Sequence, residues 1–194
     1  MIDLAKLKAA NAARWSAMHT NPALGTTLDA VARRLIDSAA KARYQTVSGQ
    51  TSVPWFIIAV IHEREASQSW AANLAQGDSW NAVSVHVPKG QGPFDSWEDA
   101  AINALKRCAP YAAHWADWSI GGALTLLEEY NGLGYAQHGV PSPYVWASTD
   151  QYKSGKYIAD GHYDPNAVDH QLGCAALLTR MAVADKSINL GAVA

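Results

Sequence analysis

The sequence has no long hydrophobic run. Its longest unbroken apolar stretch, Val53 to Ile61, is nine residues long, whereas a helix that crosses a bilayer needs about 20. We therefore expect no membrane insertion. A charge excess is also lacking, because 15 Lys and Arg stand against 17 Asp and Glu, a formal net charge of −2. Since no basic run is present, we do not expect binding to nucleic acid.

Cysteine is scarce as well. Cys108 and Cys174 are the only two, and they have no CxxC or His-paired spacing. We interpret both as small buried residues, and a disulfide between them is the alternative. The start of the chain, Met1-Ile2-Asp3-Leu4, lacks the basic and then apolar layout of a secretory signal. The protein is therefore expected to fold in the cytoplasm, where it is made.

Common metal and phosphate motifs are missing. The segment from His62 to Ala66 reads HEREA, whereas a zinc-protease helix needs a second His at the position of Ala66. There is no GxSxG, Walker loop or GxGxxG, and Gly132-Leu133-Gly134 follows an expected helix rather than a strand. The sequence thus predicts no metal and no cofactor.

The composition is that of a globular protein. With 194 residues and 49% hydrophobic side chains, residues 1–194 are expected to form a single domain. Eight Trp and eight Tyr stand against two Phe. Rings with a polar group suit a surface that is partly apolar and partly wet, such as a groove that stacks on sugars, although core packing is the alternative.

Apolar periodicity and capping residues predict a mainly α-helical fold. Residues 77–96, with a Val-Ser-Val-His-Val alternation, are expected to form a small β-hairpin or an irregular excursion. A polar loop is expected at 45–52, and an aromatic loop-rich stretch at 136–166. The expected helices span 2–18, 28–44, 54 to about 76, 97–109, 120–130 and about 166–184.

One carboxylate stands out at the end of the third expected helix, which is apolar on nearly all sides. Glu65 lies one turn from Ile61 and two from Ile58. An apolar environment raises the pKa of a carboxyl group and so favours the protonated form, which donates to a leaving oxygen. A surface glutamate is the alternative for Glu65. Glu63 points some 200° around the helix and is the rival acid, which spacing does not separate from Glu65.

Two motifs carry a family resemblance. The REAS segment at 64–67, followed about 65 residues later by EYNGLGY at 129–135, resembles the lytic transglycosylase and goose-type lysozyme superfamily. Ala66 stands where that superfamily has Ser, and its Gly-Leu-Met-Gln stretch is replaced by VSVHVPKGQGPF. From about 53 to 173, with NLAQGDSW, SPYVWAST and YKSGKYIADG, the chain is also similar to a lysozyme-like group encoded by phages and prophages.

The resemblance implies a lysozyme-like fold and cleavage of the β-1,4 bond between N-acetylmuramic acid and N-acetylglucosamine in peptidoglycan. Glu65 would be the general acid. Asp78 would hold the attacking water in an inverting hydrolysis, although a plain turn residue is its alternative. Without Asp78 in that role, the substrate's own 6-hydroxyl would attack, as in a lytic transglycosylase. The expected substrate contacts are His86, Tyr130, Asn131, Tyr135, Tyr144 and Trp146.

The expected protein is a monomeric muramidase of endolysin type. Its partner would be the glycan strand of peptidoglycan, reached through a separate membrane lesion, as phage endolysins generally do. Two other classes stay open, a chitinase-like hydrolase and a non-enzymatic sugar-binding module in which Glu65 is only a surface charge.

Overall fold

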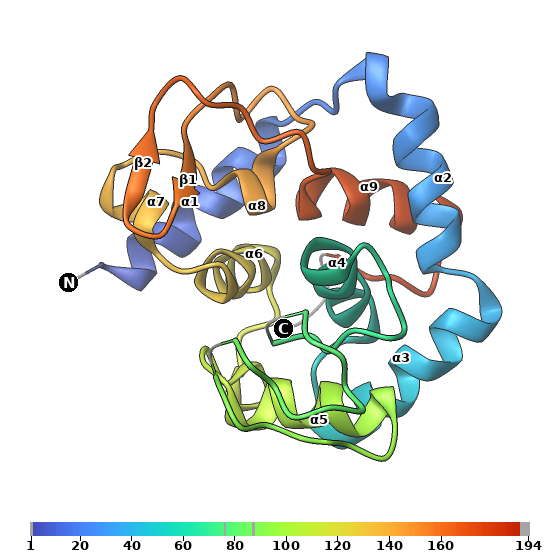
Figure 1. Cartoon of the computed structure of the whole chain (residues 1–194). Helices are drawn as coiled ribbons and strands as arrows, with labels where there is room; N and C mark the ends of the chain where they lie inside the picture. Colours follow the sequence, from blue (N-terminus) through green and yellow to red (C-terminus); the bar gives the residue numbers. More distant parts are fainter. Residues whose placement is uncertain (1, 76, 87, 191–194) are drawn as a thin grey trace. The chain divides into compact units, whose positions relative to one another are not determined.

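The computed structural model describes residues 2–75, 77–86 and 88–190 (Figure 1). The described chain is mainly α-helical with one small antiparallel hairpin, which confirms the predicted fold class. It divides into two compact units. One consists of Arg33–Ala116, and the other combines Met1–Ala32 with Asp117–Ala194.

The unit at 33–116 is built around a buried helix. Helix α3 packs against both α4 and α5 (Figure 1). Helix α4 is apolar over its first two turns, and Ile57 through Ile61 have no exposed surface. Because such a helix is buried on all sides, its polar last turn lies at the edge of the core. The elements are α3 (Ser38–Thr51), α4 (Trp55–Ala66), α5 (Trp97–Arg107) and the 3₁₀ turn η2 (Ala112–His114).

The other unit is organised by a close pair of helices, α1 and α6 (Figure 1). Gly121 permits their approach, since a Cβ there would lie 2.6 Å from the carbonyl oxygen of Lys8. Helix α2 (Gly25–Leu35) begins in this unit and ends in the other. The remaining elements are α1 (Leu4–Ala17), η1 (Pro22–Leu24), α6 (Ile120–Tyr130), α7 (Gly134–Gln137), α8 (Pro143–Trp146), β1 (Lys156–Ala159), β2 (His162–Asp164) and α9 (Cys174–Ala184).

The hairpin lies in the stretch 136–166, for which the sequence predicts loop. Strands β1 and β2 are antiparallel, with Tyr157 opposite Tyr163. The connection includes Gly161 at a positive φ of 70°, which glycine adopts without a steric penalty. Cross-strand pairing of two aromatic rings stabilises this short sheet.

The prediction of one helix at 28–44 followed by a loop at 45–52 is wrong. Helix α2 ends at Leu35, and Asp37 caps a new helix by accepting a 3.0 Å hydrogen bond from the N–H of Ala39. Helix α3 then runs through the predicted loop to Thr51. An N-cap aspartate satisfies an otherwise unpaired helix donor, and so it fixes the break at this position.

Helix α4 ends about ten residues before the predicted end. Ser67 and Gln68 both adopt left-handed backbone angles, with φ of 50° and 58°. Their N–H groups donate to the carbonyls of Glu63 and His62 at 2.9 and 3.1 Å. These bonds close the helix at Ala66 and turn the chain sharply.

No strand forms among the described residues of 77–96, so this excursion is irregular rather than a hairpin. Burial does not follow the Val-Ser-Val-His-Val alternation. Ser84 is buried, Val83 and Val85 are 54% and 66% exposed, and His86 is exposed as well. Val87, the last residue of that alternation, lies outside the described residues. The last helix, predicted from about 166, begins only at Cys174.

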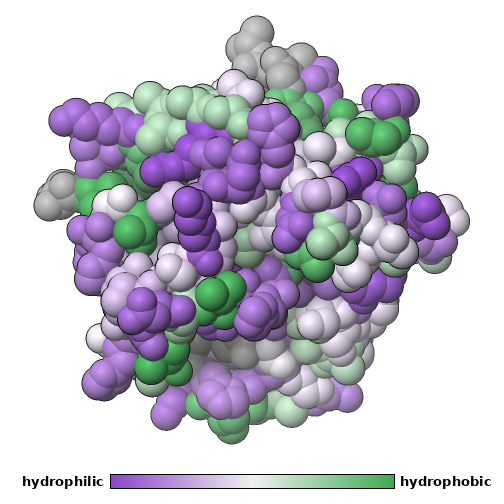
Figure 2. Space-filling model, turned by 90° about the horizontal axis from the view of Figure 1, so that it is seen from above, coloured by the Kyte–Doolittle hydropathy of each residue, from purple (hydrophilic) through white to green (hydrophobic). Residues whose placement is uncertain are grey.

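Both cysteines are buried and neither is in a disulfide, as the sequence predicted. In the described part of the chain, no helix has the length and apolar character that crossing a bilayer requires. On the face drawn in Figure 2, hydrophilic residues predominate and hydrophobic ones are scattered among them.

Candidate functional site

The last turn of α4 presents the two candidate acids. His62 and Arg64 on this turn are buried, whereas Glu63 and Glu65 are half-buried. At about 100° per residue, the two carboxyl groups leave the helix some 200° apart. They therefore face different surroundings.

Glu63 is held in an ion pair. Its Oε2 accepts a hydrogen bond of 2.7 Å from Nη2 of Arg34, and its side chain is 13% exposed. Burial raises the pKa of Glu63, and the positive charge of Arg34 opposes that rise. Because Arg34 also donates to the carbonyl of Ser67, this pair fastens the end of α2 to the end of α4.

Glu65 lies next to the segment that carries the second candidate carboxylate. Gly77 packs against its backbone, and a Cβ on Gly77 would be 3.5 Å from the carbonyl oxygen of Glu65. With φ at +70°, Gly77 makes a turn that directly precedes Asp78. The chain thus brings the aspartate segment against the last turn of α4.

Asp78 and His86 contact each other, which sequence reasoning did not anticipate. Nδ1 of His86 lies 2.6 Å from Oδ1 of Asp78. The backbone N–H groups of Val85 and His86 donate to Oδ2 at 2.9 and 3.0 Å. The bonds from the His86 backbone and ring lower the pKa of Asp78, so its carboxylate is ionised at neutral pH. This side chain is 15% exposed, whereas that of His86 is 71% exposed.

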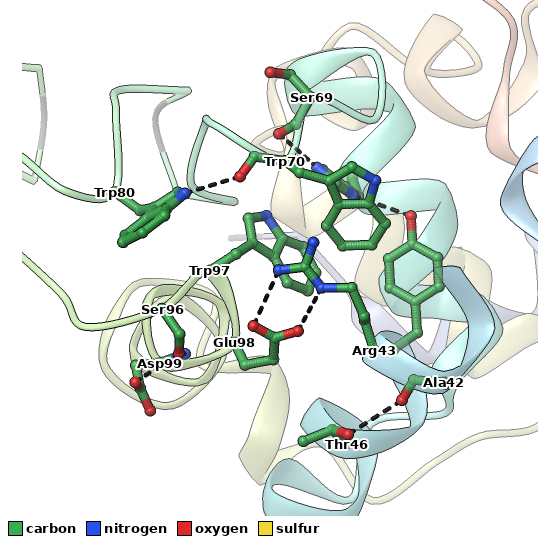
Figure 3. A network of polar contacts seen from close by, with 12 residues as sticks. Ala42, Arg43, Thr46, Ser69, Trp70, Trp80, Ser96, Trp97, Glu98 and Asp99 are labelled. Atoms are coloured by element: carbon green, nitrogen blue, oxygen red, sulfur yellow. Dashed lines mark hydrogen bonds and ion pairs between the residues drawn. The ribbon is translucent and has the colours of Figure 1, made fainter. Parts of the chain in front are cut away.

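Tryptophan side chains fasten the loop that runs from α4 to Asp78 (Figure 3). The indole N–H of Trp80 donates to the carbonyl of Trp70, and that of Trp97 to the carbonyl of Ala72. The rings of Trp70 and Trp97 meet edge to face, with centroids 4.6 Å apart. These three tryptophans therefore hold a loop in place, a role that the sequence analysis did not consider for them.

A cation completes the same cluster. The guanidinium of Arg43 lies 4.0 Å from the centroid of the Trp70 ring and forms a bidentate pair with Glu98 (Figure 3). Such a pair has a fixed planar geometry. It joins α3 to α5 and covers one face of the Trp70 ring.

His62 is neutral and fully buried. Its Nε2 lies 2.9 Å from the carbonyl oxygen of Ser69, an acceptor, so this nitrogen carries the proton. Nδ1 then accepts from the hydroxyl of Tyr44 at 3.0 Å. Burial lowers the pKa of His62 to about 4. In the described residues, no group of three or more His, Cys, Asp or Glu is arranged to hold a metal ion.

The predicted substrate contacts from position 130 onward belong to the other unit. Tyr130 is half-buried at the end of α6, and Asn131 is exposed as its C-cap. Both remain candidates for contact with a ligand.

The prediction that Tyr135, Tyr144 and Trp146 stack on sugars is wrong. Their exposed fractions are 5%, 2% and 0%, so their ring faces are covered by protein. The hydroxyl of Tyr135 accepts from the N–H of Tyr157, and the indole N–H of Trp146 donates to Glu128. Their polar atoms serve the core of this unit instead.

A buried polar side chain that the sequence does not single out lies beside α4. Gln68, immediately after the helix, is 6% exposed, and its side-chain oxygen is buried without a hydrogen-bond partner among the described residues. No local pattern identifies it, because its neighbours come from α2 and α3.

Comparisons with known proteins identify no relative: no protein-family model, curated protein or solved structure matches the chain.

Proposed function

We propose that this protein cleaves the glycan strand of peptidoglycan at the β-1,4 bond between N-acetylmuramic acid and N-acetylglucosamine, with Glu65 as the general acid. One observation supports this most strongly. A half-buried glutamate ends a buried helix, and the segment with an ionised aspartate packs against the same turn. Two carboxyl groups in unlike environments are the pairing that glycoside hydrolysis uses.

The roles follow from the two environments. Glu65, partly withdrawn from water at the end of an apolar helix, would protonate the glycosidic oxygen as positive charge builds on the sugar carbon. Asp78, kept ionised by its three hydrogen bonds, would orient the attacking water on the opposite face of the ring. An inverting hydrolase needs about 6.5–9.5 Å between such carboxyl groups.

The resemblance to lysozyme-like proteins supports the choice of substrate, and the exposed ring of His86 beside Asp78 is available to a sugar hydroxyl. If Asp78 acts only through its bonds within the loop, the 6-hydroxyl of the substrate would attack instead, and anhydro ends would result. The proposed chemistry requires no cofactor.

The first test compares two matched variants of α4. Glu65→Gln should lower the rate of murein solubilisation at least about 10²-fold, because an amide cannot supply the proton. Glu63→Gln, two residues earlier and bonded to Arg34, should retain the rate within about threefold. Loss of activity in the Glu63 variant alone would make Glu63 the acid, and no cleavage by the unaltered protein would refute the proposal.

The second test separates the two reaction types. Mass spectrometry of digested murein should show reducing ends if a water attacks and anhydro ends if the 6-hydroxyl attacks. Asp78→Asn should slow formation of reducing ends at least about tenfold. Cleavage of chitin oligomers without cleavage of purified murein would instead indicate a chitinase-like hydrolase.

A further inference from the structure

The pairing of Asp78 with His86 fixes which ring nitrogen of the histidine carries a proton. Oδ2 of Asp78 accepts from the backbone N–H groups of Val85 and His86, and Oδ1 lies 2.6 Å from Nδ1 of the His86 ring. The ionised carboxylate has no hydrogen to donate, so Nδ1 must be the donor. In the neutral ring, Nε2 then keeps a free lone pair and can accept a proton.

Nε2 of His86 is open to a reactant. The side chain of His86 is 71% exposed, whereas that of Asp78 is 15% exposed. No described residue makes a hydrogen bond to Nε2. A water molecule that arrives from solvent would therefore meet the imidazole more readily than the carboxylate beside it.

The loop that carries His86 is fastened on both sides. Ser84, two residues earlier, is 4% exposed, and its backbone N–H donates to the carbonyl of Gln91 at 2.8 Å. Its hydroxyl donates to the carbonyl of Pro88 and accepts from the N–H of Gln91, both at 2.9 Å. The side-chain oxygen of Gln91 accepts from Asn103 on α5 at 3.1 Å. Such a loop keeps a proton acceptor in one orientation, as general base catalysis requires.

The pair is also tied to the helix turn that carries the proposed acid. The N–H of Asn73 donates to the carbonyl of Asp78 at 2.8 Å. Gly77, directly before Asp78, packs against the carbonyl oxygen of Glu65. Through its bond to Asp78, the ring of His86 is therefore attached to the segment that packs on the last turn of α4.

We propose that Nε2 of His86 is the general base of the cleavage reaction and that Asp78 is its positioning residue. The role of His86 rests on the proposed cleavage with Glu65 as the acid. Asp78 acts on the water through the ring rather than directly.

The protons of this reaction balance between Glu65 and His86. As the bond from the sugar carbon to the glycosidic oxygen breaks, that oxygen takes the proton of Glu65. The oxygen of the attacking water bonds to the same carbon, and the proton that it loses moves to Nε2 of His86. The carboxylate of Asp78 faces the protonated ring through Nδ1 and stabilises its positive charge. Afterwards His86 releases one proton to solvent, and Glu65 regains one from solvent.

A measurement without substrate checks the state of the ring. Long-range ¹H–¹⁵N NMR spectra of protein labelled at the histidine ring nitrogens, at a pH at which the ring is neutral, show which nitrogen carries the hydrogen. The His86 signal is identified by its loss in the His86→Asn variant. We expect a protonated Nδ1, and Asp78→Asn should raise the share of the other tautomer because a neutral amide oxygen accepts more weakly. A proton on Nε2 in the unaltered protein would overturn the proposal.

Two substitutions separate the base from a loop contact. In His86→Asn the amide nitrogen takes the place of Nδ1 and can donate to Asp78, so the loop bond is kept while no basic nitrogen remains. On soluble, uncrosslinked glycan strands, kcat for release of reducing ends should fall at least about 10²-fold, with KM within about threefold. In His86→Gln the amide nitrogen takes the place of Nε2 and can still bond a sugar hydroxyl, but kcat should fall to a similar extent. An unchanged kcat in these variants, with or without a raised KM, would overturn the assignment.

A double variant tests whether Asp78 acts through the ring. Asp78→Asn added to His86→Asn should slow the reaction by no more than about threefold beyond His86→Asn alone, because two residues that act as a unit are not additive. If the two effects multiply instead, Asp78 contacts the water itself and the proposal is wrong.

His19 offers a matched control in the other unit. It forms a similar pair with Asp150, whose Oδ2 lies 3.0 Å from Nδ1 and whose Oδ1 accepts from the backbone N–H of His19 at 2.9 Å. This pair is not bonded to the segment beside Glu65, so His19→Asn should keep kcat within about threefold. An equal loss in both Asn variants would mean that breaking such a pair, rather than removing a base, costs the activity, and would overturn the proposal.

Glu65→Gln, assayed in parallel, distinguishes failure of this role from failure of the proposed function. Loss of cleavage in Glu65→Gln with an unchanged kcat in His86→Asn would refute the base and leave the proposed function standing. Absence of cleavage by the unaltered protein would refute both.

Discussion

The hydrogen-bond partners of His62 are compatible with only one protonation state, the neutral ring with its proton on Nε2. The carbonyl of Ser69 accepts a hydrogen bond from the N–H at Nε2, and the hydroxyl of Tyr44 donates a hydrogen bond to Nδ1. A proton added to Nδ1 would oppose that donor and place a charge in an aromatic cluster. Burial accordingly lowers the pKa of His62 from 6.5 to about 4.

This pKa predicts a loss of stability in mild acid. Between pH 6.5 and about 4 the unfolded chain binds a proton at His62 that the native protein does not bind, so the free energy of unfolding falls as the pH falls. The loss should approach about 3 kcal/mol. Urea titrations from pH 7 to 4 should show it, and a His62→Gln variant should show a flatter profile over this range.

A matched control is His114→Gln in the same unit, where the side chain is exposed. It should follow the pH profile of the unaltered protein. If the His62 variant lost stability in acid as steeply as the control, the neutral-histidine interpretation would be wrong.

Glu128 predicts the opposite trend in the other unit. It is 2% exposed and accepts from the indole N–H of Trp146, and burial raises its pKa. A carboxyl group whose pKa is raised by folding stabilises the native protein while it is protonated. This contribution to the free energy of unfolding is fully present below pH 4.5 and is lost as the pH rises through the pKa of the folded protein. Glu128→Gln keeps an oxygen for Trp146 and has no proton to lose. The variant should therefore gain stability relative to the unaltered protein as the pH rises, as thermal unfolding at pH 4 and 8 would show.

Asp150→Asn is a control for which we expect the opposite pH dependence of stability. The backbone N–H of His19 and neighbouring groups lower the pKa of Asp150 to about 2. Its contribution to stability is thus present above pH 3.8 and is lost as the pH falls through about 2. Asp150→Asn should be destabilising at neutral pH and less so in strong acid. If the two variants changed in stability in the same direction, relative to the unaltered protein, as the pH rises, the pKa shifts assigned to Glu128 and Asp150 would both be contradicted.

At the scale of elements, two helical glycines differ in their surroundings. Gly121 is required by close helix packing, whereas at Gly49 only the low helix propensity of glycine matters. In α6, a Cβ on Gly121 would lie 2.6 Å from the carbonyl oxygen of Lys8, so Gly121→Ala must push α1 away. We expect a loss of about 1–3 kcal/mol in the free energy of unfolding. In α3, a Cβ on Gly49 would meet nothing within 4 Å, and Gly49→Ala should stabilise by about 0.4–1 kcal/mol. Denaturant unfolding of both variants should give changes of opposite sign.

Helices with strong local signals were predictable from the sequence. Ser96 caps α5 through a 3.1 Å bond from the N–H of Asp99, and the predicted helix at 120–130 coincides with α6. Asp37 was missed although it is a good cap, because the apolar periodicity continues across it. The hairpin of β1 and β2 was missed because its stabilising ring pair, Tyr157 and Tyr163, forms only across the turn.

The candidate site was less predictable than the fold. The contact of Asp78 with His86 depends on an irregular loop that no periodicity encodes. Trp146 has a large aromatic ring that could stack on a sugar, but it is fully buried. Burial is decided by tertiary packing rather than by residue type. Gln68 becomes noticeable only when the partners of its amide are known.

At the scale of the whole molecule, each unit contains one buried cysteine that is not in a disulfide. Cys108 lies in the unit at 33–116 and Cys174 in the other. Their exposed fractions are 8% and 0%, and burial raises the pKa of Cys108. Since the thiolate is the reactive form, both should resist Ellman's reagent in the native protein.

Thiol labelling should therefore report the opening of each unit separately. Cys108→Ser leaves only Cys174 to react, and Cys174→Ser leaves only Cys108. We expect slow labelling of each variant in buffer and one equivalent of rapid labelling in 6 M guanidinium chloride. Rapid labelling of either variant in buffer would show that its unit opens readily under native conditions.

The pairing of α1 with α6 has a consequence for synthesis on the ribosome. Asn11, which is fully buried, donates to Thr125 across 114 positions of the chain. All of residues 33–116 must emerge before α6 exists. Helix α1 therefore lacks its helical partner while the whole unit at 33–116 is translated. Protease resistance of α1 in arrested nascent chains should accordingly appear only after Tyr130 has left the exit tunnel.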